Sequence, residues 1–218
     1  MATASESTQV TAEERARADC YALISRLFYA PADDELLQRL AAVPVALDDQ
    51  DAGLQLEKLE EDDPGISVYA VAFRELLGAA RGANADAVRQ EYDDLFVGAG
   101  KALITPYTSG YAEPHAPDRH LVTLRELIAS WGLARRESAF EVEDHVSALC
   151  DVMRWLIERN RPLEEQIPFF SEFVYAGVGT FCDAIDSNPN ASFYRLVARL
   201  ARAFLTVEKN AFDMHAAE

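Results

Sequence analysis

Apolar residues recur at the spacing of an α-helix along nearly all of the 218 residues of this chain. The stripe after Thr11 is representative, because its apolar residues lie three or four positions apart: Cys20, Leu23, Ile24, Leu27 and Phe28. The alternation of apolar and polar residues that marks a β-strand is not sustained anywhere. We therefore expect an all-α fold, a single-domain helical bundle of about eight helices over residues 1–218, with residues 1–10 flexible.

Capping residues and helix breakers indicate where these helices begin and end. Thr11 followed by Glu14 has the capping-box pattern, and the first helix stops at Pro31. Asn84 is placed to cap a helix that runs to Phe96. Further helices are expected at about 33–42, 66–81, 117–131, 140–159 and 162–185, and the last one starts at about 193.

Between about residues 98 and 116 the helical period is lost, and three glycines and two prolines interrupt the chain. Irregular loops longer than about 12–15 residues are uncommon in compact domains and are often functional or disordered. This segment also contains Ile104, Tyr107 and Tyr111, more apolar groups than a plain linker needs. We therefore expect a long loop at about 98–116 that takes part in function.

The chain is strongly acidic, with 37 aspartates and glutamates against 20 lysines and arginines and a net charge of −17. This charge would repel the phosphates of nucleic acids and of anionic membrane surfaces, so we expect neither as a partner. A basic peptide or a basic protein segment would be attracted instead. The same charge can also serve solubility alone, so it does not decide between these two interpretations.

The sequence contains no apolar run of about 18 residues, the length that would indicate a membrane-spanning helix. Its first residues are polar and lack the apolar core of a secretory signal. We therefore expect a cytoplasmic protein without stable membrane insertion. Cys20, Cys150 and Cys182 are distant from one another and fall in apolar helical stripes, so we expect them to pack in the core rather than form disulfides.

The motifs of common enzyme classes, such as glycine-rich phosphate loops, nucleophile elbows and paired-histidine zinc motifs, are absent from the sequence. On the helix expected at 140–159, Glu141 and His145 lie four positions apart and share a face, while Asp144 points elsewhere. A metal site there would need further ligands, such as His120 or Cys150. The simpler interpretation is that Asp144 and His145 anchor the preceding loop by hydrogen bonds.

Three segments together resemble one family: residues 91–98 (EYDDLFVG), 106–111 (PYTSGY) and 141–145 (EVEDH), set in an all-α chain. This arrangement is similar to the TorD/DmsD family, whose relatives form the NarJ group. Its members are cytoplasmic chaperones of molybdenum-cofactor oxidoreductases. The resemblance implies that this chain binds the twin-arginine signal peptide of a partner enzyme and holds the apo form of that enzyme back from export until its cofactor is inserted.

The resemblance also implies which residues bind the signal peptide. Carried over one by one, they are Tyr92, Leu95, Phe96, Pro106, Tyr107, Ser109, Asp144 and His145. Such a peptide has a basic part and an apolar part, so it needs an apolar groove with acidic groups nearby. Ile104 and Tyr111 add apolar groups to this set, and Glu113, Asp118 and Glu141 provide an electrostatic rim, together with Asp93 and Asp94.

Three hypotheses follow from the sequence. The first, which we favour, is a chaperone without catalysis and without a cofactor of its own, which assists molybdenum cofactor insertion into its client and is a monomer or a dimer. The second is a metal-binding helical enzyme that uses Glu141 and His145, with His120 and Cys150. The third is a non-catalytic acidic helical scaffold in which the loop at 98–116 is only disordered.

Overall fold

The computed structural model describes residues 10–44, 64–98, 102–134 and 142–216. The expectation of flexible residues 1–10 therefore falls outside the described residues, apart from Val10. Within these four ranges the chain is helical and forms no strand, so the prediction of an all-α bundle is confirmed. In the same ranges, no helix is both long enough and apolar enough to cross a membrane.

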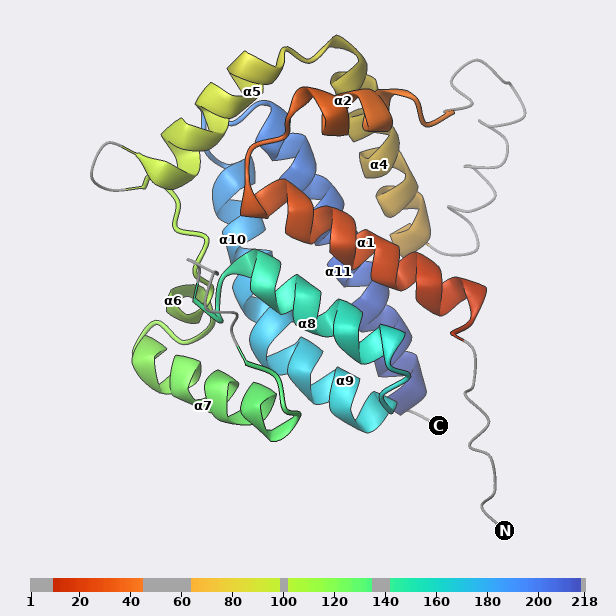
Figure 1. Ribbon diagram of the computed structural model, residues 1–218, viewed down its shortest axis with the longest axis vertical. Coiled ribbons are helices and arrows are strands. Elements are labelled where there is room, and N and C mark those ends of the chain that lie inside the picture. Colours follow the sequence, from red (N-terminus) through yellow and green to blue (C-terminus); the bar gives the residue numbers. More distant parts are fainter. Residues whose placement is uncertain (1–9, 45–63, 99–101, 135–141, 217–218) are drawn as a thin grey trace.

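The helices follow one another closely, and two of them are continued by π-helical segments, labelled η1 and η2 (Figure 1). Their bounds are α1 Ala12–Tyr29, α2 Asp34–Ala41, α4 Pro64–Gly82, α5 Ala85–Tyr92, η1 Asp93–Val97, α6 Ser109–Ala112, α7 Pro117–Ser130, α8 Val146–Glu158, α9 Leu163–Phe169, η2 Phe170–Tyr175, α10 Ala176–Asp186 and α11 Phe193–Ala216.

Several helix ends are set by the capping residues that the sequence indicates. The Thr11 hydroxyl accepts a hydrogen bond from the Glu14 amide at 3.1 Å, and the Glu14 carboxylate accepts one from the Thr11 amide at 3.0 Å. Asn84 Oδ1 accepts from the Ala87 amide at 3.0 Å at the start of α5. The predictions of a capping box and of an asparagine cap are therefore confirmed.

Two of the expected helices contain a π-helical segment and are not regular α-helices throughout. The helix expected to run from Asn84 to Phe96 has that extent, but its last turn is the π-helix η1. The helix expected at 162–185 contains Pro168, which has no amide hydrogen to donate, and the π-helix η2 follows directly. π-Helical turns are rare and occur often at functional sites, and η1 contains Leu95 and Phe96, which we call the LF motif.

The loop expected at 98–116 is also more structured than predicted. It contains the short helix α6, which packs against α10 and α7. Residues 99–101 of this segment lie outside the described residues. The expected helix at 140–159 starts later than predicted, because α8 begins at Val146.

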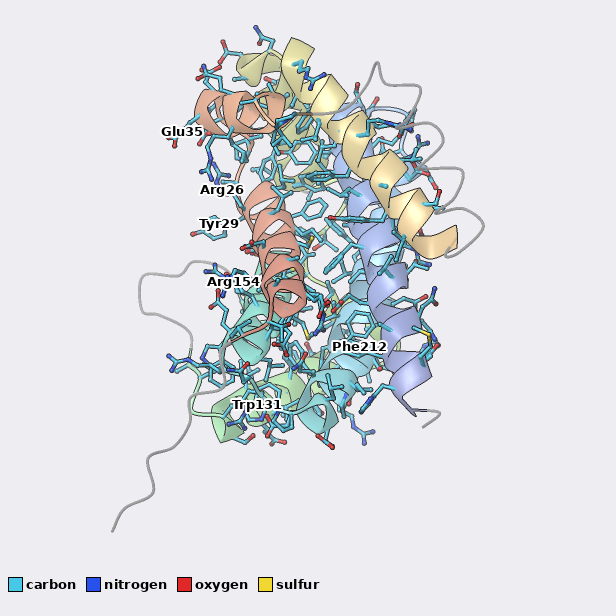
Figure 2. The ribbon with its side chains drawn as sticks, turned by 90° about the vertical axis from the view of Figure 1, so that its right-hand side faces the viewer. Arg26, Tyr29, Glu35, Trp131, Arg154 and Phe212 are labelled. Atoms are coloured by element: carbon cyan, nitrogen blue, oxygen red, sulfur yellow. The ribbon has the colours of Figure 1, made fainter. Side chains whose placement is uncertain are left out.

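The core lies between α1 and α8 on one side and α4, α10 and α11 on the other. Figure 1 shows α1 and α8 side by side in front of α10 and α11, and Figure 2 shows the side chains that fill the space between α1 and the pair α4 and α11. Cys150 and Cys182 are buried in this core as expected, while Cys20 is half-buried and its thiol lies 3.0 Å from the Tyr69 hydroxyl.

Aromatic rings connect η1 to the centre of the bundle. Phe96 meets the ring of Tyr194 edge-on at 5.3 Å between centroids and lies 5.8 Å from the ring of Phe181. Phe28 packs edge-on against Phe181 at 5.0 Å. Such pairs add roughly 0.5–1.5 kcal/mol each beyond the burial of their area. The LF motif is thus held between α1, α10 and α11.

Candidate functional site

Asp144 and His145 lie immediately before α8 and not inside a helix, so the expectation that they belong to a helix at 140–159 is wrong. His145 has extended backbone angles, with φ −64° and ψ 136°, and it occupies the cap position of α8. Its Nδ1 accepts a hydrogen bond from the Ser147 amide at 3.2 Å and lies 2.7 Å from the Ser147 hydroxyl. The ring therefore supplies the capping acceptor that starts the helix at Val146.

Hydrogen bonds join Asp144 and Val146, on either side of His145, to the loop around Thr108, which precedes Asp144 by 36 residues. The Thr108 amide and the Thr108 hydroxyl both donate to the Asp144 carbonyl, at 2.9 and 3.0 Å. The Ser109 amide donates to Asp144 Oδ2 at 3.3 Å, and the Val146 amide donates to the Pro106 carbonyl at 3.0 Å. The interpretation that this pair anchors the loop by hydrogen bonds is confirmed for Asp144, and we call residues 106–109 with 144–146 the loop joint.

Helix α10 packs closely against the loop joint at Thr108. A Cβ atom at Gly177 would lie 2.8 Å from the Thr108 Cβ, closer than real Cβ atoms come, and at a tight 3.1 Å from the Thr108 carbonyl oxygen. Glycine is therefore the residue that allows α10 to approach the loop at this point. The signal in the sequence is the pair Gly177 and Gly179 inside an apolar helical stripe, where a glycine can have a packing reason.

The apolar residues expected to contact a peptide are mostly part of the core. Tyr92 and Phe96 are each 7% exposed, Leu95 is fully buried, Ile104 is 5% exposed and Pro106 is buried. The Ile104 amide donates to the Leu95 carbonyl at 2.9 Å, which ties the end of η1 to the loop. The LF motif thus holds the loop in place and offers little open apolar surface of its own.

The two loop tyrosines are only half-buried. The Tyr107 ring meets the His145 ring edge-on at 5.4 Å, and the Tyr111 ring lies 6.3 Å from Phe181. Burial raises the pKa of the Tyr111 hydroxyl above its ordinary value. These two rings are the part of the predicted apolar set that reaches the surface, since His145 beside them is only 2% exposed.

Ser109 and the acidic rim complete the predicted set. Ser109 is 3% exposed, and its hydroxyl oxygen has no hydrogen-bond partner among the described residues. Glu113 is exposed at the end of α6, Asp118 is exposed at the start of α7, and Glu141 lies outside the described residues. The joint therefore brings the predicted loop residues, Asp144 and His145 together, with carboxylates exposed at its edge.

A metal-binding arrangement is not assembled among the described residues. No group of three or more His, Cys, Asp or Glu side chains in the described ranges is close enough to hold a metal ion. The His120 ring lies 5.0 Å from the Phe173 ring, and Cys150 is buried with a thiol pKa raised well above its ordinary value by burial. Of the ligands named for the metal hypothesis, Glu141 lies outside the described residues.

Comparison with known proteins identifies the family of this chain. The sequence profile of the family described as nitrate reductase delta subunit matches residues 59–183, a stretch that includes η1, the loop joint and most of α10. The chain belongs to the nitrate reductase delta subunit family. This membership confirms the resemblance to TorD/DmsD proteins and their NarJ relatives that the three sequence segments indicate.

One curated protein is similar to this chain over about half of its length. The chaperone protein TorD of Vibrio cholerae serotype O1 (strain M66-2) is 25% identical to this chain over 134 residues. The match covers 56% of this chain and 61% of TorD, so the chain spans less than two thirds of that relative. The loop joint thus belongs to a chain of the nitrate reductase delta subunit family that is similar to TorD over part of its length.

One positioning residue near the site was not anticipated from the sequence. The Glu91 carboxylate accepts hydrogen bonds from the amides of Ser192, Phe193 and Tyr194, at 2.8, 3.0 and 2.8 Å. A carboxylate at this place satisfies the free amides at the start of α11 and is favoured by the helix dipole. Glu91 therefore fixes α5, and with it η1, against α11. Since its partners are distant in sequence, no local pattern indicates this role.

Proposed function

We propose that this protein is a maturation chaperone that binds the twin-arginine signal peptide of a molybdenum-cofactor oxidoreductase. It holds the apo enzyme in the cytoplasm until cofactor insertion and folding are complete, and it catalyses no reaction itself. The observation that carries this proposal is the family membership over residues 59–183, which includes every described segment that carries the resemblance. The TorD relative, a chaperone by its name, supports it further.

The charge of the protein supports a basic partner. A net charge of −17 attracts a segment that carries arginines, and the exposed Glu113 and Asp118 place carboxylates at the edge of the loop joint. Asp93 and Asp94 are exposed on η1, the segment that is tied to the loop through Leu95 and Ile104. Arginine side chains pair well with such carboxylates because each guanidinium can donate two parallel hydrogen bonds.

The loop joint can offer a peptide polar contacts as well as charge. The buried Ser109 hydroxyl has an unused hydrogen-bonding capacity, and leaving it unpaired costs about 1–3 kcal/mol. A peptide group that reached this hydroxyl would recover part of that cost. The tyrosine rings at 107 and 111 are the adjacent apolar contacts.

The proposal is tested by calorimetric titration of the purified protein with twin-arginine leader peptides from molybdoenzymes encoded in the same genome. We expect micromolar or tighter binding of one leader and loss of that binding when its two arginines are changed to alanine. Binding of no leader, or equal binding of the alanine control, would contradict the proposal.

A second experiment separates the charge of Asp144 from its hydrogen bonds. Asp144→Asn keeps an acceptor oxygen for the Ser109 amide, whereas Asp144→Ala removes it. If the carboxylate attracts the leader arginines, both variants weaken leader binding. If only the loop geometry matters, Asp144→Asn binds as tightly as the wild type, and the electrostatic role of Asp144 is then wrong.

A further inference from the structure

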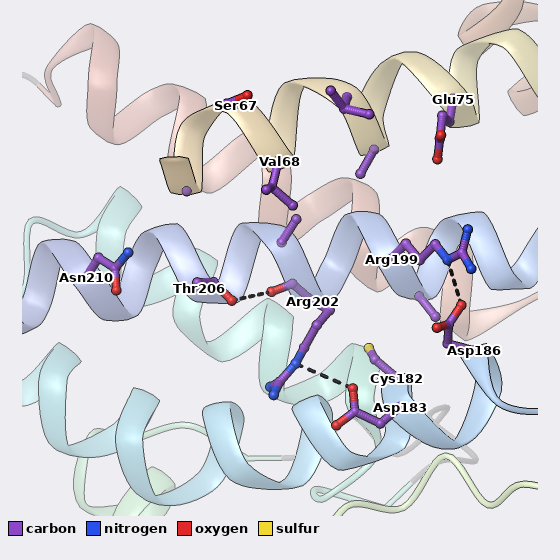
Figure 3. A pocket seen from close by; sticks show the side chains of 15 residues that line it. Ser67, Val68, Glu75, Cys182, Asp183, Asp186, Arg199, Arg202, Thr206 and Asn210 are labelled. Atoms are coloured by element: carbon purple, nitrogen blue, oxygen red, sulfur yellow. Dashed lines mark hydrogen bonds and ion pairs between the residues drawn. The ribbon is translucent and has the colours of Figure 1, made fainter. Parts of the chain in front are cut away.

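A groove of about 650 Å³ lies on the far side of α10 from the loop joint, with α11 as its base and α4 and α10 as its walls (Figure 3). Its surface is mainly apolar and is formed by small side chains, among them Val68, Val71, Ala72, Ala198 and Ala203. Val68 is 60% exposed. None of these residues belongs to the set that the sequence motifs indicate.

Helix α10 separates this groove from the loop joint. Gly177 faces Thr108 of the joint, whereas Cys182, Asp183 and Asp186 line the groove. At 100° per residue, these three positions point about 180° away from Gly177 on average. The two surfaces are thus on opposite faces of one helix, which is about 10 Å across.

The rim of the groove has more carboxylates than arginines. Arg199 is paired with Asp186 at 2.6 Å, and Arg202 with Asp183 at 3.5 Å. Glu75 adds a third carboxylate from α4, on the side of that helix that faces α11 (Figure 3). The rim therefore keeps one negative charge in excess after its ion pairs are counted, and it complements a segment that is apolar but carries cations.

The loop joint and the groove offer different surfaces to such a segment. At the joint, Leu95, Phe96 and Ile104 are at most 7% exposed, so their apolar atoms already contact the core. In the groove, apolar atoms line an open hollow. The wall formed by residues 65–75 of α4 is about 15 Å long at 1.5 Å per residue, which matches roughly three turns of a bound helix.

We propose that this groove binds the apolar segment of the leader peptide as a short helix, while the basic segment lies at the loop joint. The inference rests on the proposed function. The exposed residues Ala176 and Thr180 of α10 lie between the two surfaces and have small side chains. About five extended residues, at about 3.3 Å each, span half of the circumference of a helix, so one leader can reach both surfaces.

Charge argues against a segment of this chain itself, residues 45–63, as the occupant of the groove. Residues 45–63 (VALDDQDAGLQLEKLEEDD) contain leucines, but they also hold eight acidic residues and one lysine. That segment would bring negative charge to a rim that already has an excess of it. A leader with arginines before its apolar run is the better complement.

Four variants test the groove, with the leader found by titration as the probe. Val68→Asp and Glu75→Arg change exposed residues of the groove, so the fold should survive. Tyr29→Asp and Glu35→Arg are matched controls, since Tyr29 is 52% exposed on α1, Glu35 is exposed on α2, and both point away from α4 and α11 (Figure 2). We expect the groove variants to weaken leader binding about tenfold and the controls to leave it unchanged.

A double-mutant cycle then identifies which part of the leader the groove binds. Changing the leucines of the leader to serine should weaken binding to the wild type about tenfold, but should have little further effect on Val68→Asp. The change of the two leader arginines to alanine should weaken binding to both proteins. An equal effect of the leucine change on the wild type and on Val68→Asp would overturn the inference.

The outcomes separate this inference from the function on which it rests. If a leader binds and Val68→Asp and Glu75→Arg bind it as tightly as the controls do, the groove is not part of the leader site and the chaperone function stands. If the groove variants alter the mass of the protein in sedimentation instead, the groove is an interface between copies and the inference is wrong. If no leader binds, both proposals are wrong.

Discussion

The loop joint is closed and polar, whereas the groove between α4, α10 and α11 is open and apolar. At the joint, the amides of Thr108 and Ser109 donate hydrogen bonds to Asp144, and the apolar LF motif beside it is buried. In the groove, small apolar side chains face a hollow, and the charges are confined to the rim. The comparison shows that residues in a family motif can hold a loop in shape, while open apolar surface is built by residues outside the motif.

The contact between α10 and the loop should be the most sensitive point of the closed region. Gly177→Ala places a Cβ 2.8 Å from the Thr108 Cβ, so the loop joint must shift. We expect the free energy of unfolding to fall by about 1–3 kcal/mol, measured by urea denaturation. In Gly78→Ala, the added Cβ meets nothing within 4 Å, and this variant should gain up to about 1 kcal/mol. Equal effects of the two changes would show that the joint is not tightly packed.

Alkaline pH should destabilise the closed core. Burial raises the pKa of the Tyr21 hydroxyl and the Cys150 thiol well above their ordinary values, and in the unfolded chain these groups return to those values. Their contribution to stability is thus complete at neutral pH and is lost as the pH rises above about 9–10, where the unfolded state releases protons first. Urea midpoints measured from pH 7 to 10.5 should show this fall, and Tyr21→Phe should reduce it. A flat profile would contradict the burial of these groups.

The hydrogen bonds of the joint should make a smaller contribution. Thr108→Val removes the hydroxyl that donates to the Asp144 carbonyl, while the Thr108 amide still donates to the same oxygen. We expect a loss of about 1 kcal/mol in the free energy of unfolding. Thr123→Val is a matched control, because its hydroxyl donates within α7 on an exposed face. A larger loss in the control would mean that the Thr108 hydroxyl does not hold the joint.

Salt should affect leader binding at the two surfaces differently, and this effect should be the smallest of those predicted. Raising the salt concentration from low to physiological screens the attraction between leader arginines and exposed carboxylates, so wild-type affinity for the leader should fall several-fold. The apolar contribution, measured as the loss of affinity when the leader leucines are changed to serine, rests on apolar burial and should change little with salt. Titrations at two salt concentrations with the leader and its serine form measure this. A flat response of the arginine leader would contradict an electrostatic contribution.

The helical fold could be predicted well from the sequence because its determinants are local. Thr11 and Asn84 cap helices where expected, and the apolar stripes of 3.6-residue period are the stripes that form the core. The start of α8 was predicted too early, because the His145 ring caps the helix through Nδ1 and the backbone there is extended. The period of the surrounding residues cannot reveal a histidine in this role.

The candidate site could be predicted only in part. The motifs identify residues that the structure brings together, such as Tyr107, Ser109, Asp144 and His145. They do not reveal that Leu95 and Phe96 are buried, since a buried and an exposed apolar residue look alike in sequence. The groove could not be predicted, because α4 is distant in sequence from α10 and α11, and the helical period does not show that their small side chains leave a hollow.

The most direct test of the central claim is calorimetric titration of the wild-type protein with twin-arginine leaders of molybdoenzymes from the same genome. The proposed function predicts that one leader binds saturably with micromolar or tighter affinity and that its double-alanine control does not. Absence of binding for every leader, or equal affinity for a leader and its control, would contradict the assignment of this nitrate reductase delta subunit family member as a signal-peptide-binding chaperone.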